Sequence, residues 1–70
     1  MSKMSYDQIL PLLNKTVLIE FEGQQDTAYI QAVADDRMEV IVNPNEGDNE
    51  FYAELYFDEA DAWKIVDLVG

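Results

Sequence analysis

The chain has 70 residues and a formal net charge of −11, from fifteen acidic residues against four basic ones. With 49% hydrophobic residues it can form a core, but a chain of this length hides only about 60% of its unfolded surface, so a deep substrate pocket is hard to build. The absence of cysteine and histidine removes disulfides, thiolate metal sites and the commonest catalytic bases and nucleophiles. We therefore expect one non-catalytic domain over residues 1–70, with no cofactor and no metal ion.

The charge balance also restricts the partners. Direct binding of DNA or RNA requires clustered Lys and Arg, and anionic membranes repel a chain of this charge. The first eight residues, MSKMSYDQ, contain no apolar run, and no stretch approaches the roughly 20 apolar residues of a membrane helix. We expect a cytoplasmic protein whose partners are basic proteins, such as those that bind nucleic acid.

The N-terminal segment predicts a short helix. Ser5 suits the N-cap, and Gln8 completes a capping box. Pro11 removes a backbone hydrogen bond, so either the helix stops near Leu10 and a second turn begins at Pro11, or one helix is kinked. The apolar residues of this segment are expected to lie in the core and to cover one end of a small sheet; they are Ile9, Leu10, Leu12 and Leu13.

Five segments show the alternation and the β-branched or aromatic content typical of strands. They are residues 16–22, 27–34, 38–43, 50–58 and 63–68. Polar turns are expected at residues 23–26, 35–37 and 43–48, and a helical turn capped by Asp58 is expected at residues 58–62. The expected core includes four aromatic side chains, Phe21, Phe51, Phe57 and Trp63.

A short N-terminal helix followed by about five antiparallel strands predicts an α+β or mainly β fold, as a small barrel or a strongly bent sheet. In the order of its elements alone, the chain resembles SH3-like and Sm-like barrels, and this resemblance carries no site residue with it. Four apolar residues fall opposite the expected core parity; they are Val33, Ile41, Val66 and Leu68. They could cover the helix or form a second apolar face for a homodimer.

Residues 46–61, EGDNEFYAELYFDEAD, hold seven carboxylates, four aromatic rings and no basic residue. A strand here has two faces, because side chains alternate at period two. The face expected to be buried carries Phe51, Ala53, Leu55 and Phe57. The candidate partner-binding residues are Glu46, Asp48, Glu50, Tyr52, Glu54, Tyr56, Asp58, Glu59 and Asp61. Because tyrosines are enriched in interfaces and carboxylates pair with arginine forks, this face is either a binding surface or a solvated outer face.

Residues 43–50 partly resemble a calcium loop, because oxygen donors alternate there. Counted from Asn43, Gly47 falls at position five, whereas the EF-hand loop needs glycine at position six. Two of the ligands would also be amides. A polar turn with solvated acids is therefore expected here.

The density of acids favours one function class. A 70-residue domain is about 28 Å across, and duplex DNA of that length carries about 16 phosphate charges, against fifteen carboxylates here. We expect a small acidic inhibitor, encoded by a phage or mobile element, that mimics nucleic acid and blocks the DNA- or RNA-binding groove of a host defence or DNA-processing enzyme (anti-CRISPR or anti-restriction type). The alternative is a non-catalytic SH3-like structural or adaptor module that self-assembles or docks on a basic protein.

Overall fold

The structure is a computed structural model that describes residues 6–59 and 62–69. It begins with one turn of α-helix and one 3-10 turn, α1 (Tyr6–Ile9) and η1 (Leu10–Leu12). The strands are β1 (Thr16–Phe21), β2 (Gln24–Val33), β3 (Arg37–Val42), β4 (Phe51–Tyr56) and β5 (Trp63–Leu68). Two further 3-10 turns flank β4, η2 (Gly47–Asn49) before it and η3 (Phe57–Glu59) after it. Within the described residues no helix has the length and apolar character needed to cross a membrane.

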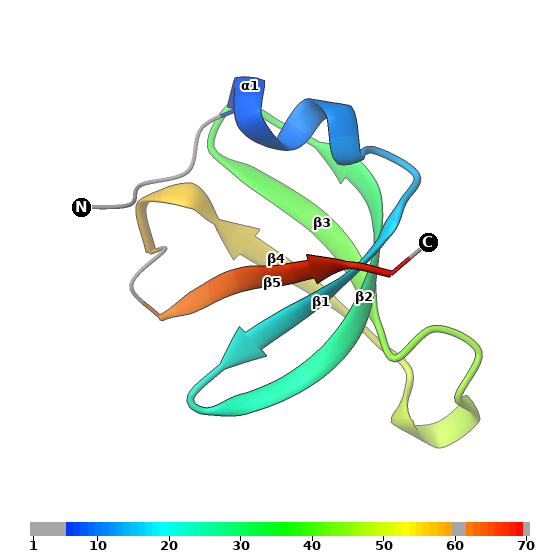
Figure 1. Ribbon diagram of the computed structural model, residues 1–70. Helices are drawn as coiled ribbons and strands as arrows, with labels where there is room; N and C mark the ends of the chain where they lie inside the picture. The colour runs from blue at the N-terminus through cyan, green and yellow to red at the C-terminus, as the bar shows by residue number, and fades with distance from the viewer. Residues whose placement is uncertain (1–5, 60–61, 70) are drawn as a thin grey trace.

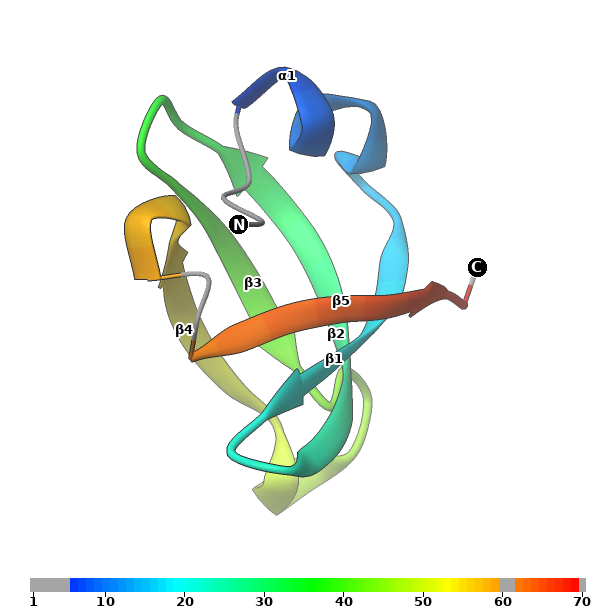
Figure 2. The same ribbon diagram turned by 60° about the vertical axis from the view of Figure 1, so that its left-hand side comes forward.

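All five strands form one antiparallel sheet in the order β4-β3-β2-β1-β5, so β4 and β5 are its two edges. The sheet is strongly bent, and the end of β4 and the start of β5 come to the same side of the molecule (Figures 1 and 2). Within the described part of the chain these two edge strands do not pair with each other. The predicted mainly β fold, with a short N-terminal helix and five antiparallel strands, is confirmed as a bent sheet that is not closed.

A β-bulge in β2 changes which of its side chains face inward. The register of the β2–β3 pair shifts between Ile30 and Ala32, and beyond the shift Val33 lies opposite the buried Met38. An extra residue in one strand reverses the alternation that follows it. Val33 therefore packs against the core, whereas the sequence parity had placed it on the outer face.

A second bulge interrupts the pairing of β1 with β5, where the register shifts between Leu18 and Ile19. It brings Leu68 opposite the buried Val17, on the inner parity, although Leu68 itself stays exposed at the end of an edge strand. Ile41 remains on the outer parity of β3, opposite Tyr52. The four residues that had been grouped as a second apolar face therefore do not share one face.

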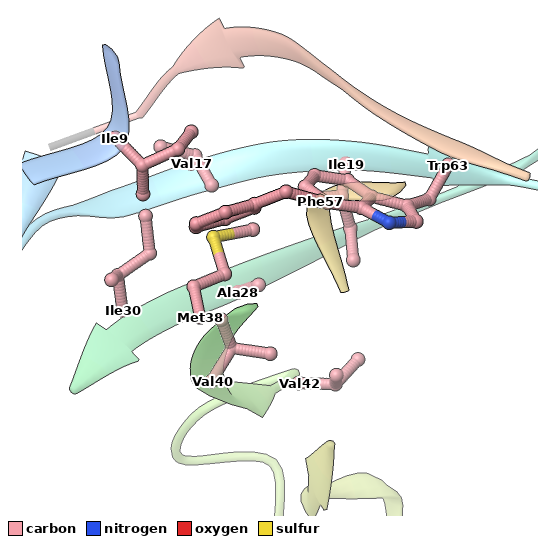
Figure 3. Packing of buried hydrophobic residues seen from close by; sticks show 10 residues of the cluster. All are labelled: Ile9, Val17, Ile19, Ala28, Ile30, Met38, Val40, Val42, Phe57 and Trp63. Atoms are coloured by element: carbon pink, nitrogen blue, oxygen red, sulfur yellow. The ribbon is translucent and has the colours of Figure 1, made fainter. Parts of the chain in front are cut away.

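The core lies inside the bend of the sheet and is capped at one end by α1 (Figures 1 and 3). Its buried members are Ile9, Val17, Ile19, Ala28, Ile30, Met38, Val40, Val42, Phe57 and Trp63. Phe57 and Trp63 join aliphatic side chains from β1, β2 and β3, as predicted (Figure 3). The prediction is wrong for Phe21 and Phe51, which are 44% and 55% exposed. Both stand at the ends of their strands, beside the gap between the two sheet edges, so no strand covers them.

The N-terminal segment follows the first of its two predicted forms, because α1 ends at Ile9 and a 3-10 turn contains Pro11. Proline is suited to the first turn of a helix, where its missing N–H breaks no bond. Of the apolar residues expected in the core, Ile9 is buried and Leu12 packs against it, but Leu10 and Leu13 are exposed. Two single turns present only one side to the sheet. The predicted N-cap, Ser5, lies outside the described residues.

The hairpin between β1 and β2 is tighter than predicted. Its loop is Glu22-Gly23, with φ angles of 52° and 82°, and Gln24 already pairs with Phe21. Two-residue loops with positive φ at both positions match the twist of the flanking strands. The predicted turn at residues 23–26 is therefore wrong in extent, because residues 24–26 belong to β2.

Candidate functional site

The predicted partner-binding residues follow β4 and the two turns that flank it (Figure 1). Glu46 and Asp48 lie in the loop before β4, and both are exposed. Asp58 and Glu59 lie in η3, directly after β4, and are exposed as well. These four acids are therefore exposed at the two ends of β4, two before the strand and two after it, and we call them the acidic row. Asp61 lies outside the described residues.

Three candidate side chains contact each other on the outer face of β4. The hydroxyl of Tyr52 donates to Glu54 Oε2 at 3.0 Å, and the hydroxyl of Tyr56 donates to Glu54 Oε1 at 3.1 Å. The period of two places the residues on one face, and the carboxylate between them accepts from both tyrosines. Each carboxylate oxygen keeps a second acceptor site for a further donor. We call this group the tyrosine–carboxylate face.

The two tyrosines hold their protons more tightly than free tyrosine. Partial removal from water, together with the hydrogen bond to Glu54, raises the pKa of Tyr52 to about 12. The hydrogen bond and the charge of Glu54 also raise the pKa of Tyr56. Ionising either hydroxyl would remove its donor proton and place a second negative charge beside the carboxylate.

Arg37 is part of this face, although the sequence pattern predicts a turn at residues 35–37. It begins β3 directly opposite Tyr56, and its guanidinium carbon lies 5.8 Å from the centre of that ring. Its nitrogens lie 2.9 Å from Asp36 Oδ1, 3.6 Å from Glu39 Oε2 and 3.8 Å from Glu54 Oε2. The hydrogen bond to Asp36 raises the pKa of Arg37 above its usual value. Three carboxylates around one guanidinium leave this cluster with a net negative charge.

Glu50 was predicted to continue the tyrosine–carboxylate face, but its side chain turns back into the loop. The backbone N–H of Asn45 donates to Glu50 Oε2 at 3.0 Å. The loop adopts left-handed φ angles at Asn43, Asn45 and Gly47, which asparagine and glycine tolerate best.

In the residues that the structure describes, no three His, Cys, Asp or Glu side chains gather as a metal ion would require.

The inner side of β4 lines an apolar groove that no sequence motif predicts. The groove has a volume of about 380 Å³, and its lining includes Phe21, Phe51, Ala53, Leu55 and Trp63. It lies at the gap between the two edge strands, which explains why both phenylalanines are exposed. The only sequence signal was the position of the two aromatic residues at strand ends, next to turns.

Comparison with known proteins gives no match among protein-family models, curated proteins or solved structures. What the molecule can bind therefore has to be inferred from its own surfaces. These are the acidic row, the tyrosine–carboxylate face and the apolar groove, all of which adjoin β4.

Proposed function

We propose that the protein is a small acidic inhibitor that mimics nucleic acid and occupies the basic DNA- or RNA-binding groove of a partner protein. The observation that carries this proposal is the exposure of four acids, two before β4 and two after it, on a chain with a net charge of −11. Residues 46–69 concentrate the charge, because Lys64 is their only basic residue. A groove lined by Lys and Arg that binds phosphates offers the complementary potential to such a row.

The size of the molecule agrees with this role. Its longest dimension is 33 Å, and duplex DNA of that length carries about 19 phosphate charges. The chain carries fifteen carboxylates and a net charge of −11, so the charge per unit length is comparable. On binding, it would release counterions held by its own carboxylates, as nucleic acid releases those held by its phosphates.

The tyrosine–carboxylate face supplies a structured centre for the row. Because both oxygens of Glu54 accept hydrogen bonds from tyrosines, this carboxylate is held in one orientation, which favours recognition by the planar fork of an arginine. Arg37 already occupies a related position within the molecule, beside Tyr56 and three carboxylates. Tyr52 is half exposed beside it and offers an aromatic surface of the kind enriched in interface centres.

The target class follows from the same chemistry. A host nuclease, a restriction enzyme or a CRISPR effector presents a long basic groove, and a phage or mobile element gains by blocking it. The protein would act in the cytoplasm, without catalysis of its own and without binding nucleic acid directly. Its inhibition would be relieved by excess duplex DNA.

The test is capture of the target followed by competition. The immobilised protein is exposed to host lysate, and bound proteins are eluted with duplex DNA at constant ionic strength. We expect a nucleic-acid-binding enzyme to elute with DNA and only weakly with matched salt. Elution by salt alone, or of no such enzyme, would reject the proposal.

A charge-neutralised variant then locates the contact. Glu46→Gln, Asp48→Asn and Asp58→Asn together should weaken target binding by at least about tenfold. The matched control, Asp7→Asn, Glu20→Gln and Asp67→Asn, removes the same charge from α1, β1 and β5, outside β4 and its flanking turns. Equal weakening by both variants would show that only net charge matters and would reject the acidic row as the contact.

A further inference from the structure

The apolar groove on the inner side of β4 points to a second binding surface. We propose that it receives an extended segment of a partner protein, added as a strand to the free edge of β4, in which apolar and basic side chains alternate. This inference goes beyond the proposed mimicry, because it uses the free edge and the inner side of β4, and Glu59 is the one residue of the acidic row that takes part in it.

Two hydrogen bonds show which backbone N–H and C=O groups of β4 point toward its unpaired edge. The carbonyl of Tyr56 accepts the indole N–H of Trp63, so it points away from β3. The backbone N–H of the next residue, Phe57, points toward β3, because it donates to the carbonyl of Asp36, which directly precedes that strand. In an antiparallel strand the N–H and C=O of one residue point to the same side, and the side alternates. The backbone groups of Tyr52 and Glu54 therefore face the free edge, where an added strand can bond to them.

The groove provides room for apolar side chains of that strand. Its volume of about 380 Å³ falls in the range of ligand-binding pockets, roughly 300–1,000 Å³. The small side chain of Ala53 leaves space in its wall, and the rings of Phe21 and Phe51 stand exposed at its rim. An inserted apolar side chain would cover both rings and remove them from water.

The charges around the groove select a basic segment. Asp26 and Glu59 belong to its lining, and none of the lining residues within 6–59 and 62–69 is basic. An adjoining hollow shares both phenylalanines and adds Glu22. A second copy of this chain is a poor occupant, because each copy carries a net charge of −11 and like charges on facing strands repel.

Alternation follows from the two faces of β4. In a strand added to β4, every second side chain points inward toward the groove, and the others point toward the tyrosine–carboxylate face. The inward positions require apolar residues, and the outward positions lie near Glu54, which requires Arg or Lys. The occupant is therefore a segment with the pattern basic–apolar–basic–apolar.

The test uses an amidated peptide of sequence RVKFRVK and a reordered control, RRKKVFV, which has the same composition and charge. Binding is followed by the fluorescence of Trp63, the only tryptophan of the chain, which lines the groove. We expect the alternating peptide to bind at least about tenfold more tightly than the control. In NMR spectra it should shift the indole signal of Trp63 and the amide signals of Tyr52 and Glu54.

Variants separate the groove from general charge attraction. Phe21→Ser and Phe51→Ser, both at exposed positions, should each weaken the alternating peptide by about tenfold or more. Leu68→Ser, at an exposed apolar position outside the groove lining, should leave its affinity unchanged. Equal affinity for both peptides, no binding at millimolar concentration, or light scattering that shows dimers dissolved by Phe51→Ser would each overturn the proposal.

The outcomes also distinguish this site from the mimicry. The variant Glu46→Gln, Asp48→Asn, Asp58→Asn should keep its preference for the alternating peptide over the reordered one. If that preference persists while no DNA-displaceable target is found, the proposed function fails and the groove stands. If the preference is absent while a DNA-displaceable target is found, the groove proposal alone fails.

Discussion

The indole N–H of Trp63 donates a hydrogen bond of 3.0 Å to the backbone carbonyl of Tyr56. This bond joins the start of β5 to the end of β4, the two edges of a five-stranded sheet that do not pair with each other in the described residues. One side chain thus links the two edges at one end of the gap, beside the apolar groove that Trp63 also lines.

Removing this link should destabilise the fold. Trp63→Phe keeps an aromatic ring in the core but deletes the donor and leaves the carbonyl of Tyr56 without it. We expect the free energy of unfolding to fall by about 1–3 kcal/mol, measured by urea denaturation with circular dichroism. Val66→Thr, at an exposed position of the same strand, should stay within about 0.5 kcal/mol of the parent. Similar stability of Trp63→Phe and the parent would contradict the structural role of the bond.

The core boundary can be tested at two apolar residues. Met38 is 0% exposed, so Met38→Ala should cost about 2–5 kcal/mol of unfolding free energy through lost burial and a cavity. Phe51 is 55% exposed, and Phe51→Ala should cost less than about 1 kcal/mol. The same urea titrations measure both. Comparable losses of unfolding free energy in the two variants would show that Phe51 is buried in the core, as the alternation of the sequence predicts.

The β1–β2 hairpin contains a residue whose conformation disfavours its side chain. Glu22 has a φ of 52°, and the left-handed region costs most L-residues roughly 1–2 kcal/mol, but asparagine less. Glu22→Asn should therefore raise the free energy of unfolding by up to about 1 kcal/mol. Glu22→Gln is the control, because it removes the same charge without relieving the backbone. If the two variants are equally stable, the gain came from charge.

Gly23 tests the other position of the same loop. Its φ is 82°, and a Cβ added there would meet no atom within 4 Å. The cost of Gly23→Ala is therefore conformational, and we expect a loss of about 1 kcal/mol or more in unfolding free energy. Thermal unfolding followed by circular dichroism measures this. An unchanged or higher melting temperature would show that the loop does not adopt this conformation.

Stability should fall at alkaline pH. The folded-state pKa of Tyr52 is about 12, above the usual value of about 10 for unfolded chains. The folded state therefore binds more protons between these values, so its contribution to stability is complete below about pH 10 and is lost as the pH rises through about 12. Tyr56, whose pKa is also raised, acts in the same direction. Urea midpoints measured across this range should decline less steeply in Tyr52→Phe, and identical slopes would contradict the shift.

The sequence by itself determined the local elements of this protein. The alternation of β4 predicts that Tyr52, Glu54 and Tyr56 share one face, because period two depends only on residues a few positions apart. The structure adds the hydrogen bonds among them. The same local reasoning predicted either a break or a kink at Pro11, and the structure has the break. Phe57 directly follows β4 and Trp63 begins β5. Both were correctly predicted to be buried, because each continues the inward-facing alternation of its strand.

Only the tertiary structure decided how these elements meet. Arg37 enters the tyrosine–carboxylate face because the β3–β4 register sets it opposite Tyr56, and register depends on residues far apart in the chain. Two bulges reversed parities that simple alternation had assigned. Phe21 and Phe51 line an open groove because the bend of the whole sheet leaves its edges unpaired. Curvature and register are set by long-range packing, which no local pattern contains.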